Sequence, residues 1–126
     1  MPGSGSERRV LVVDDEPKVA DTTAAVFASA GFSSRAVYTA EDALELIPRW
    51  TPHVAVIDVH LPGISGIDLA IHLKSEYPAC KSSLFSGFVD SGELLESARK
   101  EGHTFELLAK PIPPKELLQL ASDSPS

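Results

Sequence analysis

The sequence predicts an α/β protein: a single domain built on a doubly wound sheet of five parallel strands, with five helices covering its two faces. Two observations lead to this prediction. Short apolar runs alternate along the chain with amphipathic stretches of roughly ten to fifteen residues. The two strongest apolar runs also stop abruptly at aspartates. Strict alternation of strand and helix implies right-handed crossovers, and these give a parallel sheet that is buried on both faces.

The first half of the chain carries two strands and two helices in this pattern. Residues 10–13 (VLVV) are apolar throughout, as expected of a strand that is buried on both faces. A helix is expected over 17–31, with proline in its first turn and glycine at its C-terminal cap. Residues 32–38 alternate loosely and form the second predicted strand. Thr39 or a neighbour is expected to cap a second helix that ends near Pro48.

The second half of the chain continues the alternation. Residues 54–59 (VAVIDV) carry the strongest strand signal of the sequence. The expected elements that follow are a helix over 64–77, a strand at 84–85, a helix over 93–100, a strand over 105–109 and a short helix over 114–120. The strand at 84–85 is predicted to be the weakest, because two serines precede its two apolar residues.

Length and composition agree with one globular domain. The chain has 126 residues, of which 43% are hydrophobic and 23% charged, and this balance suits a single core. We expect a flexible leader at 1–7, the folded domain at 8–121 and a flexible tail at 122–126. The one cysteine, Cys80, allows no internal disulfide, and the sequence has no signal peptide or membrane-spanning run, so a cytoplasmic location is expected.

The charge balance argues against a nucleic-acid partner. The formal net charge is −7, and the basic residues are scattered, with Arg8 and Arg9 as the only adjacent arginines. Proteins bind nucleic acids through clustered Lys and Arg side chains that neutralise phosphates. We therefore expect no direct nucleic-acid binding and no membrane partner.

Polar side chains fall at four of the predicted strand ends. These residues are Asp14 and Asp15 after the first strand, Asp58 at the end of the third, Ser86 at the end of the fourth and Lys110 after the fifth. Each one alone has an ordinary explanation as a helix cap, a turn residue or part of a solvated loop. Because parallel strands end at the same edge of a sheet, all five are expected to converge in one crevice, which is where ligands of open α/β sheets bind.

Three carboxylates in one crevice predict a metal-assisted reaction. Crowded carboxylates repel one another, and they stay ionised together only beside a cation. Oxygen ligands without His or Cys suit Mg²⁺ or Mn²⁺. A carboxylate beside such a cation is able to act as a nucleophile toward a phosphoryl group. A Lys amine and a Ser hydroxyl would then bind the other phosphoryl oxygens.

The ordered motifs make the resemblance to one family specific. Residues 12–17 (VVDDEP), 56–66 (VIDVHLPGISG), 84–87 (LFSG) and 110–111 (KP) resemble the corresponding segments of the response-regulator receiver family of two-component signalling. The resemblance covers most of the chain, roughly residues 8–120. It implies the flavodoxin-like, CheY-like (βα)5 fold with strand order 2-1-3-4-5.

The resemblance also implies roles for the acidic residues at the sheet edge. Asp58 matches the phosphoacceptor of the family. Asp14 and Asp15 match the acidic pair that binds Mg²⁺ (or Mn²⁺), with Asp58 itself and the backbone carbonyl of His60 completing the protein ligands. A Mg²⁺-dependent phosphorelay is therefore expected to load Asp58.

Two further residues complete the site that the resemblance implies. Lys110 matches the lysine that pairs with a phosphoryl oxygen, and Ser86 matches the hydroxyl that moves toward the phosphoryl group after transfer. Members of the family usually carry an aromatic residue three positions before the lysine, where this chain has Leu107. Phe105 lies two residues earlier on the same strand face, so either residue is a candidate for that switch position.

The resemblance implies partners as well. The phosphoryl donor would be a sensor histidine kinase or a histidine phosphotransfer protein, and the output partner would be a protein that the sequence does not identify. The domain would take up and lose the phosphoryl group by its own catalysis, without being a conventional turnover enzyme. The partner surface is expected on the fourth helix, fifth strand and fifth helix, and the short last helix favours a homodimer through that face.

Three other classes of function remain open. An aspartyl-nucleophile phosphatase needs a second Asp two residues after the nucleophile, where this chain has His60. A flavodoxin-like cofactor binder would want Ser, Thr and Gly in the turn that here holds Asp14 and Asp15. A pseudo-receiver that only binds partners would not need the complete acidic set.

Overall fold

The computed structural model describes residues 8–86, 96, 106–109 and 112–122 of the chain. Its elements, in chain order, are β1 (Arg9–Val13), α1 (Pro17–Ser29), β2 (Ser33–Val37), α2 (Ala40–Leu46), a 3-10 turn (Ile47–Arg49), β3 (Val54–Asp58), α3 (Gly66–Glu76), β4 (Lys81–Ser86), β5 (Glu106–Ala109) and α5 (Pro114–Ser122). The predicted helix over 93–100 lies outside the described residues, as do the predicted leader and almost all of the predicted tail.

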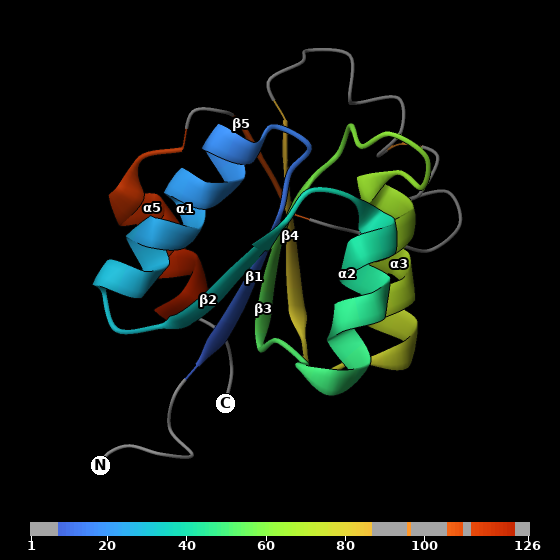
Figure 1. The fold of residues 1–126 in the computed structure, drawn as a ribbon, viewed down its shortest axis with the longest axis horizontal. Coiled ribbons are helices and arrows are strands. Elements are labelled where there is room, and N and C mark those ends of the chain that lie inside the picture. The colour runs from blue at the N-terminus through green and yellow to red at the C-terminus, as the bar shows by residue number, and fades with distance from the viewer. Residues whose placement is uncertain (1–7, 87–95, 97–105, 110–111, 123–126) are drawn as a thin grey trace.

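The strands form one parallel sheet in the order β2-β1-β3-β4-β5. β2 and β5 are its edges, and the other three strands lie inside it. Figure 1 shows α1 and α5 on one face of this sheet and α2 and α3 on the other. The predicted α/β class, with a parallel sheet covered on both faces in that strand order, is confirmed, and the described residues contain four of the predicted helices.

Each face of the sheet carries its own hydrophobic core, because side chains alternate along a strand. In β1, Leu11 and Val13 belong to the core under α2 and α3, whereas Val10 and Val12 belong to the core under α1 and α5. β1 is therefore apolar on both sides, as its sequence pattern predicted. None of the helices in the described part of the chain is both long and apolar enough to cross a membrane.

Local sequence signals set the ends of three helices. Pro17 stands in the first turn of α1, and Gly31, with φ +97°, follows its C-cap. The side chain of Thr39 accepts a hydrogen bond from Asp42 N at 3.0 Å and so caps α2, as predicted. The side chain of Ser65 caps α3 in the same way.

β4 is longer than its sequence indicates. It spans Lys81–Ser86 instead of the predicted 84–85, because β3 offers backbone hydrogen bonds along its whole length whatever side chains β4 carries. Ser82 and Ser83 both pair with β3. Ser83 is fully buried, and neither hydroxyl has a hydrogen-bond partner among the described residues.

Candidate functional site

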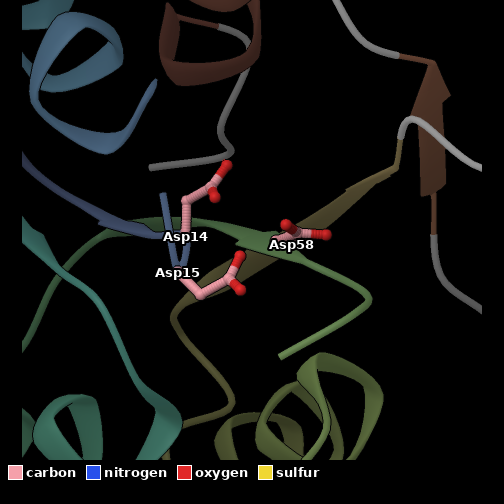
Figure 2. Close-up of side chains that lie close together, drawn as sticks. All are labelled: Asp14, Asp15 and Asp58. Atoms are coloured by element: carbon pink, nitrogen blue, oxygen red, sulfur yellow. The ribbon is translucent and has the colours of Figure 1, made fainter. Parts of the chain in front are cut away.

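Three aspartates gather beyond the carboxyl ends of two neighbouring strands. Asp14 and Asp15 lie in the turn after β1, and Asp58 is the last residue of β3. Because β1 and β3 pair in parallel, with Val13 opposite Ile57, their ends lie side by side. One carboxylate oxygen from each aspartate lies within 4.8 Å of the others. Figure 2 shows the three side chains together at this edge of the sheet.

This carboxylate cluster, Asp14, Asp15 and Asp58, combines buried and exposed groups. Asp14 is 0% and Asp58 is 5% exposed, whereas Asp15 is exposed to solvent. Three carboxylates at this separation repel one another, and burial strengthens the repulsion because water screens the charges less. The cluster offers oxygen ligands only, so a hard divalent cation such as Mg²⁺ or Mn²⁺ fits its chemistry.

Backbone N–H groups orient the two buried carboxylates. Glu16 N donates to Asp14 Oδ1 at 2.9 Å, and His60 N donates to Asp58 Oδ1 at 3.0 Å. Each bond reaches two residues along the chain, as in an Asx turn. Glu16 is the N-cap of α1 and makes no capping bond with its own side chain. Asp14 therefore supports the start of α1 and belongs to the carboxylate cluster at the same time.

The loop between β3 and α3 is held closely against the strand end. Gly66 N donates to Val59 O at 3.1 Å. A Cβ atom built on Gly66 would collide with the backbone carbonyl of Asp58. Glycine therefore lets the first turn of α3 approach the residue that ends β3. Gly66 was missed as a site residue in the sequence, although it closes the motif at 56–66 that carries the family resemblance.

Glu41 of α2 also reaches this loop and was missed in the sequence. Its Oε2 accepts a hydrogen bond from Ile64 N at 3.4 Å. The same oxygen occupies the space that a side chain on Gly63 would need, and Gly63 has φ +74°. α2 therefore helps to set the path of the loop that carries His60. Because Glu41 and Ile64 are 23 positions apart, no local sequence pattern indicates their contact.

Ser86 lies at the same edge of the sheet as the carboxylate cluster. It is the last residue of β4, is 5% exposed, and pairs with Ala109 of β5. Its neighbour Phe85 pairs with Asp58. The structure thus brings Ser86 next to the strand end that carries Asp58, as the predicted sheet required.

Three other predicted site residues belong to the fifth strand or its end. Lys110 directly follows the last residue of β5 but lies outside the described residues. Phe105 also lies outside them, whereas Leu107 is part of β5 and pairs with Leu84. The choice between Phe105 and Leu107 for the switch position stays open, and the role of Lys110 stays a prediction.

Two titratable side chains outside this site have raised pKa values, for different physical reasons. Tyr38 donates a hydrogen bond from its hydroxyl to Asp21 Oδ1 at 2.8 Å, and this bond is the main reason why the pKa of Tyr38 is raised. Burial raises the pKa of Cys80 to about 12, so its thiol stays protonated at neutral pH. Cys80 is therefore an unreactive buried residue.

Comparison with known proteins identifies the family of the chain. Residues 10–122 match the model of the response regulator receiver domain. The chain belongs to this family of two-component signalling domains, as the motifs at its strand ends predicted.

Individual relatives are similar over most of this chain. The DNA-binding response regulator MtrA of Mycolicibacterium smegmatis is 30% identical over 113 residues, which cover 88% of this chain and 47% of MtrA. The nitrogen assimilation regulatory protein NtrX of Azorhizobium caulinodans is 30% identical over 105 residues, 82% of this chain and 23% of NtrX. The chain thus spans less than half the length of these relatives. A signal receiver domain of an HD-domain-containing protein from Pseudomonas fluorescens Pf-5 is similar with a TM-score of 0.83, 23% identity and 94% coverage of both chains, which supports the fold alone.

The expectation of no nucleic-acid partner is contradicted by one of these relatives, MtrA. MtrA is a DNA-binding regulator, and the matched region is less than half of it. The net charge of −7 was counted over the 126 residues of this chain, nearly all of which match the receiver domain. A charge count over a receiver domain does not report on nucleic-acid binding by the rest of a regulator, so the reasoning from net charge was wrong.

Proposed function

We propose that this domain is a phosphorylation switch in which Asp58 accepts a phosphoryl group with Mg²⁺ (or Mn²⁺) bound beside it. The observation that carries the proposal is the carboxylate cluster itself. It places two further aspartates within 4.8 Å of a buried aspartate that ends an interior strand. Membership of the receiver family supports the same assignment.

The proposed transfer begins with attack by a carboxylate oxygen of Asp58. That oxygen attacks the phosphorus of a phosphohistidine on a histidine kinase or a histidine phosphotransfer protein. The P–N bond breaks, the imidazole leaves and takes up a proton, and Asp58 becomes an acyl phosphate. His60 N holds Asp58 Oδ1, so the carboxylate meets the donor in one orientation.

The other residues of the site bind the charges around the transferred group. The carboxylate cluster would hold the cation together with the backbone carbonyl of His60. When bound there, Mg²⁺ supplies positive charge that offsets the charge of the phosphoryl group. We assign to Lys110 an ion pair with a phosphoryl oxygen. Ser86, which is 5% exposed beside this strand end, would form the hydrogen bond that couples phosphorylation to the rest of the domain.

The domain limits and the output are part of the same proposal. The folded domain would cover residues 8–121, with the helix over 93–100 completing the fourth of five βα units. MtrA, which resembles this chain over 47% of its own length, is a DNA-binding regulator. We therefore assign to phosphorylation of Asp58 the control of a DNA-binding output that lies outside the matched region.

Beryllofluoride and acetyl phosphate test the proposal with Mg²⁺ present. We expect ¹⁹F NMR to show beryllofluoride bound to the wild type, and intact mass spectrometry to show one added phosphoryl group after acetyl phosphate. Asp58→Ala abolishes both signals. Asp42→Asn removes an exposed aspartate of α2 and leaves them unchanged. A wild type that stays unmodified in Mg²⁺ would contradict the proposal.

A further inference from the structure

A cluster of arginines lies at the amino end of the sheet, opposite to the carboxylate cluster. The chain has five arginines and one tryptophan. Three of the arginines, Arg9, Arg35 and Arg49, lie around that tryptophan, Trp50. These four residues, named here the arginine cluster, come from the start of β1, the middle of β2 and the end of the turn after α2. The fold therefore assembles the cluster from three separate segments.

Two of the guanidinium groups lie over the same aromatic ring. Arg9 Cζ is 5.8 Å and Arg35 Cζ is 5.2 Å from the centroid of the Trp50 ring. Both arginines belong to the sheet face that α2 covers, because Arg35 pairs with Leu11 and Leu11 shares its face with Arg9. The fold thus holds two like charges at one ring.

The described residues offer little negative charge to this cluster. Neither Arg9 nor Arg35 forms an ion pair with them. Arg49 Nη2 lies 3.7 Å from Glu45 Oε1, but the two side chains are 70% and 80% exposed. An exposed ion pair of this kind contributes little, so Arg49 is able to exchange Glu45 for another anion.

A neighbouring histidine responds to the positive charge at this end. Partial desolvation, followed by the charges of Arg8 and Arg9, lowers the pKa of His53. His53 Nδ1 accepts a hydrogen bond from Arg9 N at 2.9 Å, which places the imidazole beside the start of β1. A chain with a net charge of −7 therefore has a locally positive end.

A cavity of about 280 Å³ opens at the arginine cluster and is lined by Arg35, Leu46, Arg49 and Trp50. Packing alone explains the ring contacts, since arginine stems cover aromatic surface and cations suit the C-terminal end of α2. Packing does not explain why guanidinium groups line an open cavity in which, among the described residues, the exposed Glu45 alone forms an ion pair with them. The planar fork of a guanidinium matches two phosphate oxygens at once. We propose that the arginine cluster binds a phosphate-bearing anion, independently of any phosphorylation of Asp58.

Trp50 reports directly on the proposed site, because it is the only tryptophan in the chain. The wild type is titrated with pyrophosphate while tryptophan fluorescence is followed. A phosphate group that moves guanidinium groups relative to the Trp50 ring changes the emission, and the change is expected to saturate. EDTA removes divalent cations, and the phosphorylation proposed for Asp58 depends on Mg²⁺, so Asp58 takes up no phosphoryl group in this titration. Failure of the function proposed for Asp58 is therefore distinguishable from failure of this site.

Two variants and one matched control test the arginines themselves. Arg35→Gln and Arg9→Gln each remove one guanidinium and are expected to weaken pyrophosphate binding about tenfold, the usual effect of losing one charge-assisted interaction. Lys115→Gln removes the same charge from an exposed position on α5, on the other face of the sheet, and is expected to change the affinity less than about twofold. A wild type without a saturable response would overturn the proposal, and so would equal affinities for Arg35→Gln and Lys115→Gln.

A second titration identifies the source of the phosphate. A short DNA duplex replaces pyrophosphate, with the same three variants. If the duplex saturates the Trp50 signal at a lower concentration of phosphate groups than pyrophosphate does, and its affinity falls steeply with salt, the natural ligand is a nucleic-acid backbone. If pyrophosphate alone binds, the ligand is a small phosphate compound. If neither binds, the site does not exist.

Discussion

The two ends of the sheet concentrate opposite charges in different settings. At the carboxyl end, Asp14 and Asp58 are buried and each accepts a backbone N–H. At the amino end, Arg9 and Arg35 are exposed and lie against one aromatic ring. Short side chains fixed by the backbone suit a small cation that needs set distances, whereas long side chains in water suit a larger anion.

The two ends of the sheet also bring like charges together in two different ways. The carboxylate cluster forms where two paired interior strands end, so the sheet itself sets the distances between its members. The arginine cluster forms on β1 and the edge strand β2 and depends on how the segment after α2 packs beside them. Substitutions that move the backbone should therefore disturb the carboxylate cluster most. Substitutions that remove one charge should affect the arginine cluster without moving the backbone.

The largest expected effect comes from Gly66→Ala, which alters the backbone packing at the carboxyl end of the sheet. The new Cβ meets the carbonyl of Asp58 and must push α3 away from the strand end. We expect the free energy of unfolding to fall by about 3 kcal/mol in urea titrations. Gly31→Ala is the control, because no atom lies within 4 Å of its Cβ and only the strain of φ +97° remains. It should cost about 1 kcal/mol, and equal losses for the two variants would show that the close approach at Gly66 has no special weight.

The effect of Asp15→Asn on stability is expected to reverse its sign when Mg²⁺ is added. Without divalent cations, the variant should be more stable than the wild type by about 0.5 kcal/mol, because it relieves repulsion at an exposed position of the carboxylate cluster. In excess Mg²⁺ it should be less stable by about 2 kcal/mol, because the bound cation loses a charged ligand. Thermal unfolding with EDTA and with Mg²⁺ measures both effects. If the stability difference between the variant and the wild type is the same with and without Mg²⁺, the proposed metal site is wrong.

Ser83→Ala tests a buried polar group in β4, midway between the two ends of the sheet. The Ser83 hydroxyl is buried without a hydrogen-bond partner among the described residues, so its removal should raise the free energy of unfolding by about 1 kcal/mol. Ser34→Ala is the matched control, because Ser34 Oγ donates to Ala24 O at 2.7 Å. That variant should instead lose about 1 kcal/mol. Denaturant unfolding of both variants separates the two cases, and a loss on Ser83→Ala would mean that its hydroxyl is satisfied.

The smallest expected effect is a pH dependence at the amino end. The pKa of His53 is lowered from its usual 6.5 in the folded protein, so the unfolded chain binds the proton more readily. The contribution of His53 to stability is therefore complete above about pH 6.5 and is lost as the pH falls toward the lowered folded value. Thermal unfolding of the wild type and His53→Gln across this range measures it. The stability difference between the two should shrink as the pH falls, and a constant difference would show that His53 does not titrate abnormally.

Much of the fold and of the carboxyl end is predictable from the sequence, because the signals are local. The aspartates of the carboxylate cluster lie at or just after the ends of strands that their apolar patterns reveal, and parallel strands necessarily end at one edge. Thr39 caps α2 and Gly31 ends α1 for equally local reasons. The fold class and the meeting of these carboxylates therefore follow from local sequence signals.

Contacts between distant segments were decided only by the tertiary structure. The length of β4 depends on the hydrogen bonds that β3 offers, which its serines do not reveal. The contact of Glu41 with Ile64 depends on how α2 packs beside the loop after β3. Arg35 stands in the middle of an edge strand, and only the register of β2 on β1 and the position of α2 bring it to Trp50. Such contacts join residues far apart in the chain, so no periodicity or motif encodes them, and the positive end of this acidic protein appears only when the chain is folded.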